Sequence, residues 1–172
     1  KSVPTLGMNM ILESEWKTNL EKTRENYFKL FGQLDIIHRI TNNEKLVFAN
    51  GTKVKWINNN NFEFYQASSV GGSNNLRAYR AERFSGKSSF SNSSDVRFNL
   101  GQLKNPILPV NYGIFAGYDV GRVWNDAEYS KKWHQSVGGG LWLNLAESVT
   151  GKMNYFYGSD GGLFSVDFGV NF

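Results

Sequence analysis

The end of the chain shows a strict alternation of apolar and polar residues. From residue 164 to residue 172 the even positions hold Phe, Val, Phe, Val and Phe, whereas the odd positions hold Ser, Asp, Gly and Asn. A repeat of two residues places the two sets on opposite faces of a β-strand. The segment 163–172 is therefore predicted to be a strand with one apolar and one polar face.

The same alternation occurs in seven earlier segments. In 112–124, for example, Tyr112, Ile114 and Tyr118 alternate with small residues and with Asp119. The longest connection between such segments is 57–94, which is mostly polar. The pattern predicts an all-β chain of eight antiparallel strands that follow one another in sequence order. The predicted strands lie near 7–16, 27–38, 45–56, 95–100, 112–124, 136–146, 151–158 and 163–172.

Composition alone does not separate a water-soluble protein from a membrane protein. Mean hydropathy is −0.44, yet aromatic residues make up 15% of the chain. A strand that crosses a bilayer needs only about 10 residues and alternates between lipid and lumen, which keeps mean hydropathy low. Trp16, Trp56 and Trp124 lie at strand ends, where an aromatic girdle would fall. The sequence predicts a transmembrane barrel with its apolar faces toward lipid and its charged faces toward the lumen.

The long connection contains the segment FEFYQASSVGGSNNLRAYR, in which an aromatic pair (Phe64 and Tyr65) precedes two glycines and a short arginine motif. This segment resembles the surface-antigen (BamA/TamA-like) superfamily of outer-membrane assembly and translocation proteins. In that superfamily a V/L-R-G-F/Y motif lies on the sixth outer loop, which folds back into the lumen. The matching residues are Gly71, Gly72, Leu76, Arg77, Ala78 and Tyr79. Ala78 departs from the family, which has Gly there, and it would be costly if the position needed a positive φ.

The neighbouring segments resemble consecutive strands of the same superfamily. SSDVRFNL (93–100), YGIFAGYDVGRVW (112–124) and SVGGGLWLNL (136–145) are similar to its twelfth, thirteenth and fourteenth strands. The resemblance implies that residues 1–172 form the C-terminal half of a sixteen-stranded barrel in the bacterial outer membrane. The last strand is similar to the C-terminal signal that the barrel assembly machinery reads. Its residues are Phe164, Val166, Phe168, Val170 and Phe172.

The resemblance also implies a role for the arginine of the loop. Within 57–94, Arg77 would enter the lumen and pair with Asp119 and with Asp95, which the alternation also places on lumenal faces. A guanidinium offers five donors in a planar fork that matches a carboxylate. A long loop inside a wet lumen needs such contacts, because ordering it costs conformational entropy.

Few residues of the chain suit catalysis. Two His and no Cys do not provide a thiolate site or a His-rich dinuclear metal site. The glycines at 71–72 and 138–140 lack the following Lys-Ser/Thr of a phosphate loop. The net charge of +4 comes from scattered residues rather than from a basic stripe that would bind nucleic acid. We expect no enzymatic activity, no cofactor and no metal in this segment, and no nucleic-acid partner.

The function implied by the resemblance is that of a barrel scaffold for the assembly, insertion or translocation of polypeptides. The expected partners are outer-membrane lipid, the barrel assembly machinery, the N-terminal part of the same barrel, client polypeptides and accessory lipoproteins. Three alternatives stay open. One is a self-contained eight-stranded structural or adhesive barrel, and another is a soluble, ligand-binding barrel of the lipocalin type. The third is a barrel that anchors a metallophosphoesterase, because GRVW and the Lys-Trp-His at 132–134 are similar to a subgroup with that fusion.

Overall fold

The computed structural model describes residues 5–18, 26–58, 67–73, 75–103, 109–125, 132–145 and 149–170. Within these ranges the chain is all-β, as predicted. The long strands are β1 (Gly7–Lys17), β2 (Tyr27–Arg39), β3 (Leu46–Ile57), β6 (Ser88–Leu103), β7 (Val110–Trp124), β8 (His134–Leu145), β9 (Val149–Gly158) and β10 (Gly161–Val170). Two short strands, β4 (Ser68–Val70) and β5 (Phe84–Gly86), lie within the longest connection. The described residues form no helix that could cross a lipid bilayer.

The eight long strands form one antiparallel sheet in the order β1-β2-β3-β6-β7-β8-β9-β10. Each of these strands therefore pairs with the one that follows it among the long strands, and β3 joins β6 across the longest connection. Within the described residues, β1 and β10 form the two edges of this sheet, which is open rather than closed on itself. The antiparallel meander is as predicted, whereas the sixteen-stranded closure stays a prediction.

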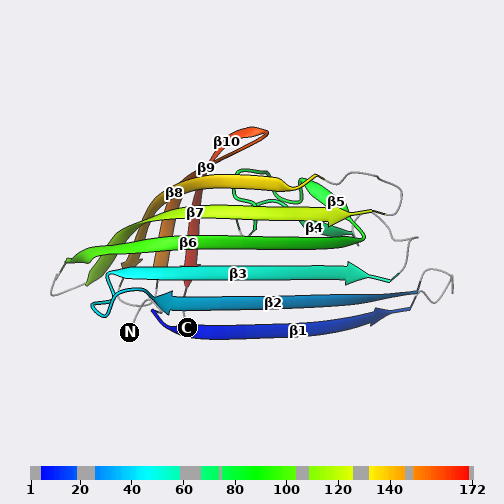
Figure 1. Cartoon of the computed structure of the whole chain (residues 1–172), viewed down its shortest axis with the longest axis horizontal. Helices are drawn as coiled ribbons and strands as arrows, with labels where there is room; N and C mark the ends of the chain where they lie inside the picture. Colours follow the sequence, from blue (N-terminus) through cyan, green and yellow to red (C-terminus); the bar gives the residue numbers. More distant parts are fainter. Residues whose placement is uncertain are drawn as a thin grey trace.

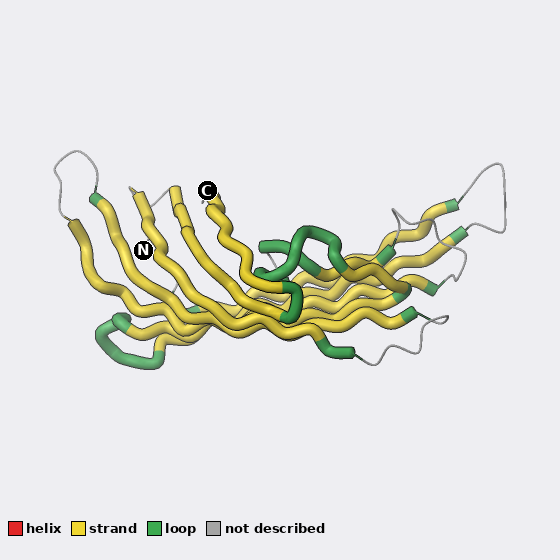
Figure 2. Tube along the Cα trace, turned by 90° about the horizontal axis from the view of Figure 1, so that it is seen from above, coloured by secondary structure: helices red, strands yellow, loops and turns green. Residues whose placement is uncertain are grey.

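The sheet is strongly curved. Figure 1 shows β8, β9 and β10 turning out of the plane in which β1 to β7 lie. Seen from above, the sheet has a concave side, and the segment that carries β4 and β5 rests on that side (Figure 2). Curvature of this kind follows from the right-handed twist of β-strands and is needed for a sheet to become part of a barrel.

The convex and concave faces differ in chemistry. Along β7, Phe115 and Asp119 are buried on the concave face, whereas Ile114 and Tyr118 are 43% and 44% exposed on the convex face. In water such a large apolar surface would be unfavourable, but a barrel wall must present it to lipid. Exposed apolar side chains on the convex face include Met8, Met10, Leu12, Trp16, Val54, Trp56, Val96, Phe98, Leu141, Leu143, Met153, Tyr155 and Tyr157.

One strand boundary differs clearly from the expectation. The sequence predicts a strand near 95–100, but β6 begins at Ser88 and ends at Leu103. Residues 88–94 read SSFSNSS and lack the apolar alternation that marks a strand. They are extended because they pair with β3 on one side and β7 on the other, and Ser89 and Ser91 are buried on the concave face. A Ser-rich strand of this kind is stabilised by its neighbours rather than by its own pattern.

Candidate functional site

The candidate site is the docked loop, residues 67–73 and 75–87, together with the concave face beneath it. Its base is closed by the pairing of β4 with β5. Gly71 and Gly72 have φ values of 126° and 104°, which residues with a Cβ atom rarely adopt. Asn75 Oδ1 accepts hydrogen bonds from the backbone N–H groups of Gly71 and Leu76, each 2.8 Å long. These contacts fold the loop tip before any contact with the sheet is counted.

Arg77 extends from this tip to Asp119 of β7. Its Nε lies 3.1 Å and 3.0 Å from the two carboxylate oxygens, and its Nη2 lies 2.5 Å from Oδ1. The backbone N–H of Arg77 donates a further bond of 3.0 Å to Oδ2 of Asp119. Asp119 is fully buried and Arg77 is 8% exposed. The arginine is therefore joined to one carboxylate through both its side chain and its backbone.

A second carboxylate and an aromatic ring complete the surroundings of Arg77. Nη1 lies 2.8 Å from Oδ1 of Asp95 on β6, and the two groups form an ion pair. The guanidinium carbon lies 3.9 Å from the ring centroid of Phe156 on β9. Burial lowers the pKa of the Arg77 guanidinium, but the hydrogen bonds and charges of Asp119 and Asp95 outweigh burial and raise it. Arg77 therefore remains a cation.

Glycines of the sheet make room for the docked loop. A Cβ atom on Gly117 would lie 2.5 Å from Arg77 Nη2 and 2.6 Å from Asp95 Oδ1. A Cβ atom on Gly158 would lie 2.9 Å from the ring of Tyr79. Side chains at these positions would occupy the volume that the loop fills, so the Gly-rich face of β7 and the end of β9 form its seat.

Tyr79 fixes the other side of the loop tip. Its hydroxyl donates to the backbone oxygen of Gln135 at 3.1 Å and accepts from the backbone N–H of Ser159 at 3.1 Å. Its ring packs edge-on against Phe84 and His134. Ala78 is 5% exposed and is not among the residues with positive φ. An alanine at this position therefore carries no penalty from a positive φ, which in this part of the loop is found at Gly71 and Gly72.

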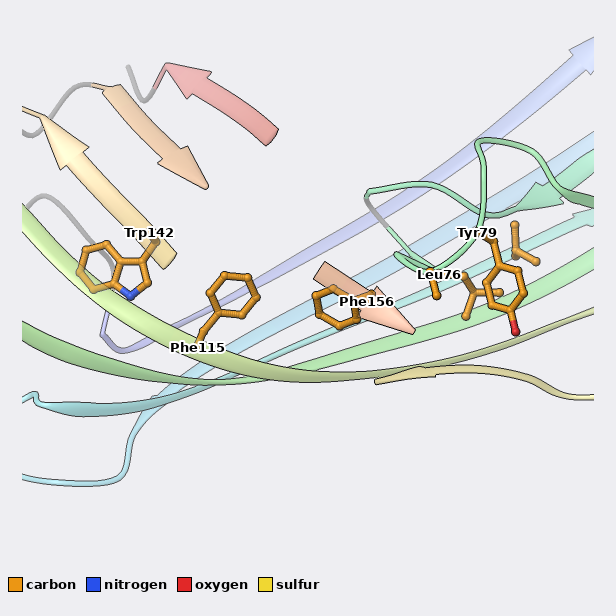
Figure 3. Packing of buried hydrophobic residues seen from close by; sticks show 7 residues of the cluster. Leu76, Tyr79, Phe115, Trp142 and Phe156 are labelled. Atoms are coloured by element: carbon orange, nitrogen blue, oxygen red, sulfur yellow. The ribbon is translucent and has the colours of Figure 1, made fainter. Parts of the chain in front are cut away.

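Apolar packing surrounds these polar contacts. The buried cluster consists of Val70, Leu76, Ala78, Tyr79, Phe115, Trp142 and Phe156. Figure 3 shows its labelled side chains in a row along the concave face, from Trp142 and Phe115 through Phe156 to Leu76 and Tyr79. Burial of such side chains stabilises the docked position in proportion to the apolar area removed from water. The loop is thus held by both an ion pair and a small core.

The structure brings Arg77, Asp119 and Asp95 together, and Leu76, Ala78 and Tyr79 lie beside them in the docked loop. In the C-terminal strand, Phe164, Val166 and Phe168 are 61%, 44% and 80% exposed on the convex face. Val170 is the last residue of β10. The predictions for Phe64, Tyr65 and Phe172 concern residues that lie outside the described ranges.

Sequence reasoning missed three contacts of the site. Ser136 Oγ donates to Asp119 at 2.7 Å, and it lies directly opposite Asp119 in the pairing of β7 with β8. The register of two alternating segments could have indicated this contact. Ser93 Oγ donates to the backbone oxygen of Asn75 at 2.7 Å, and Phe156 lies under Arg77. These two contacts depend on where the loop docks, for which the sequence gives no local signal.

The arrangement joins a cation of the loop to two carboxylates of the sheet. Among the described residues, no group of three or more His, Cys, Asp or Glu side chains could hold a metal ion. The two carboxylates of the concave face beside the loop tip, Asp95 and Asp119, both contact Arg77. The geometry therefore provides a means to hold a loop on the inner wall of a curved sheet.

Comparisons with known proteins agree with this fold. The family model of the Omp85 superfamily domain matches residues 1–158. Among solved structures, the chain is similar to BamA from Haemophilus ducreyi lacking POTRA domains 1–3, with a TM-score of 0.73 and 15% sequence identity. That match covers 96% of this chain and 38% of the BamA chain, so this chain spans less than half of that protein. No curated protein matches the sequence.

Proposed function

This chain belongs to the Omp85 superfamily, and from that membership we propose that it forms half of a barrel that assembles, inserts or translocates polypeptides at the bacterial outer membrane. The segment acts as a scaffold and not as a catalyst. Its partners are outer-membrane lipid, the barrel assembly machinery and the polypeptides that pass through or beside the barrel, together with accessory lipoproteins.

The observation that carries this proposal is the docked loop on a sheet whose convex face is apolar. Arg77 is joined to Asp119 on the concave face, while residues such as Ile114 and Leu141 are exposed on the other face. A soluble barrel would place its charged groups in water and its apolar groups inside. The opposite arrangement is suited to a lipid-embedded wall around a polar lumen.

The edges of the sheet support the sixteen-stranded closure. β1 and β10 each have one neighbour within the described residues, and a strand edge cannot be left open to lipid. We infer that the N-terminal half of the same barrel pairs with both edges. With the end of β10 in the periplasm, the long link from β3 to β6 lies on the outer side. From the resemblance we infer a weak lateral seam near the last strand, with the bilayer thinned beside it.

The proposal is tested in the bacterium that produces the protein. Depletion of the full-length protein should lower the amount of folded barrels, or of translocated polypeptides, in the outer membrane. The protein itself should fractionate with that membrane and migrate faster on gels before heating than after it. An unchanged content of folded outer-membrane proteins after complete depletion would contradict the proposed function. Recovery of the protein itself in another cell compartment would contradict the proposed location.

A narrower proposal rests on sequence resemblance alone. GRVW of β7 and the segment 132–134 are similar to barrels that follow a calcineurin-like metallophosphoesterase domain. In that case the barrel anchors or exports a catalytic domain whose residues are outside this chain. The full precursor would then hydrolyse phosphoesters in a metal-dependent manner, and this chain by itself would not. Absence of that activity from a full precursor loaded with metal would exclude the narrower proposal.

A further inference from the structure

Charged side chains are distributed unequally between the two faces of the sheet. In the described strands, every Asp, Glu and Lys and two of the arginines, Arg39 and Arg97, alternate onto the concave face. Arg122 of β7 is the exception. It lies opposite Phe90 of β6 and shares the convex face with Tyr118 and Trp124. A single cation on an apolar wall requires an explanation, because an arginine is costly at the midplane of a bilayer and tolerated only near its boundary.

Arg122 lies within a group of aromatic rings. Its guanidinium carbon is 5.0 Å from the ring centroid of Trp124 and 5.8 Å from that of Trp133. The two indoles meet edge to face at 6.2 Å, and Phe90 contacts Trp133 in the same manner at 5.9 Å. Trp124 and Trp133 remain 38% and 45% exposed. Cation–π contacts therefore hold the guanidinium beside rings that are themselves open to the surroundings.

A groove adjoins this cluster. Its volume is about 440 Å³, and it is lined by the exposed Lys132, by Trp133 and by residues of the ends of β8 and β9. On the convex side its apolar lining consists of Tyr118, Val137 and Tyr157, which are 44%, 59% and 60% exposed. The groove thus combines an apolar wall with a cation at its edge, and Trp133 belongs both to the groove and to the Arg122 cluster.

We propose that Arg122 and Lys132 bind the phosphate group of an outer-leaflet lipid, whose adjoining acyl chain lies against Tyr118, Val137 and Tyr157. This inference rests on the proposed function, which places the ends of β7 and the start of β8 at the outer surface of the membrane. An aromatic girdle accounts for tryptophans at that level but not for a cation among them. A guanidinium matches phosphate oxygens in a fork, and an ammonium adds a second positive charge.

The test uses the full-length protein in nanodiscs of phosphatidylethanolamine that contain either bisphosphorylated lipid A or its dephosphorylated form. Native mass spectrometry then measures how much lipid A stays bound to the protein. The wild-type protein should retain the phosphorylated form, and Arg122→Gln combined with Lys132→Gln should retain about tenfold less. Lys55→Gln is the matched control, because it removes a cation from the concave face near the same end of the sheet and should change nothing.

Three results would overturn the inference. Equal retention of the dephosphorylated lipid would show that the phosphate group does not contribute to binding. Equal retention of lipid A by the double variant would show that Arg122 and Lys132 do not bind it. Displacement of lipid A by millimolar inorganic phosphate would indicate a site for free anions rather than for a lipid. Heat-modifiable migration is measured on the same samples. A protein that does not fold as a barrel would contradict the proposed function, whereas a folded barrel without lipid selectivity would contradict only this inference.

Discussion

At the scale of single residues, the docked loop depends on one buried carboxylate. Asp119 accepts hydrogen bonds from the backbone and side chain of Arg77 and from the hydroxyl of Ser136. A buried charge is tolerable only when it is paired and hydrogen-bonded, and both conditions are met here. The charges of Arg77 and Asp119 are therefore compensated by each other rather than by water.

This mutual dependence predicts a non-additive double-mutant cycle in the full-length barrel. Arg77→Ala and Asp119→Ala should each lower the free energy of unfolding by about 3 kcal/mol, because each leaves an uncompensated buried charge. The double variant should lose much less than the sum of the two. Arg77→Lys should recover only part of the loss, since an ammonium lacks the planar fork. Urea unfolding followed by tryptophan fluorescence measures all four proteins.

The control for this cycle lies in the same loop. Arg83 forms an ion pair with Asp160 at 3.0 Å, with side chains 53% and 39% exposed. Exposed pairs contribute roughly 0–1 kcal/mol, so Arg83→Ala should change unfolding little. The coupling between Arg77 and Asp119 would be excluded if the stability losses of Arg77→Ala and Asp119→Ala were fully additive. It would also be excluded if Arg83→Ala lowered the free energy of unfolding as much as Arg77→Ala does.

The glycine seat gives a second prediction at this scale. Gly117→Ala places a methyl group against the Arg77 guanidinium, the Asp95 carboxylate and the Phe156 ring, so the loop must shift. We expect a loss of about 1–3 kcal/mol from overpacking and faster proteolysis of the docked loop. Gly169→Ala is the matched control in β10, because its Cβ would meet no atom within 4 Å. Equal protease resistance of the Gly117 variant and the wild-type protein would show that the seat is not needed.

At the scale of elements, the alternation of apolar and polar residues identifies the convex, apolar face and the concave, polar face of each strand. In β9, Met153, Tyr155 and Tyr157 are exposed on the convex face while Asn154 and Phe156 are buried on the other. The pattern is informative because lipid and lumen impose opposite preferences on neighbouring residues. It fails at the start of β6, where the Ser-rich segment has no apolar face and its extended form follows from pairing with β3 and β7.

The face assignment of β10 predicts unequal tolerance to charge. Val166 is 44% exposed on the convex face, whereas Ser165 donates a hydrogen bond to Asn154 on the concave face. Val166→Arg should destabilise the folded protein in bilayers by about 2–4 kcal/mol if it lies near the midplane. Ser165→Arg should cost clearly less, because its side chain enters a polar lumen. Folding into liposomes, titrated with urea, compares the two, and equal losses would contradict the orientation.

At the scale of the whole molecule, the order of the strands could be predicted, but the docking of the loop could not be derived from the pattern. The alternation places Asp119 and Asp95 on one face, and the superfamily motif indicates that Arg77 enters the lumen. Neither indicates that Arg77 stacks on Phe156 or that Tyr79 bonds to Ser159, since these contacts join residues far apart in sequence. They arise only once the curvature of the sheet brings β7, β8 and β9 under the loop, and the role of these residues as an anchor stays a prediction.

The open edges of the sheet give the last prediction. Residues 1–172 alone should not fold into a stable, heat-modifiable barrel in liposomes, because β1 and β10 would expose unpaired N–H and C=O groups to lipid, each at a cost of several kcal/mol. Co-refolding with the N-terminal half of the same barrel should restore heat-modifiable migration and protease resistance of the docked loop. An unrelated eight-stranded barrel, refolded in parallel, controls for the liposomes. If the 172-residue chain folds by itself as a heat-modifiable monomer, the chain is a self-contained eight-stranded barrel, and the sixteen-stranded proposal is wrong.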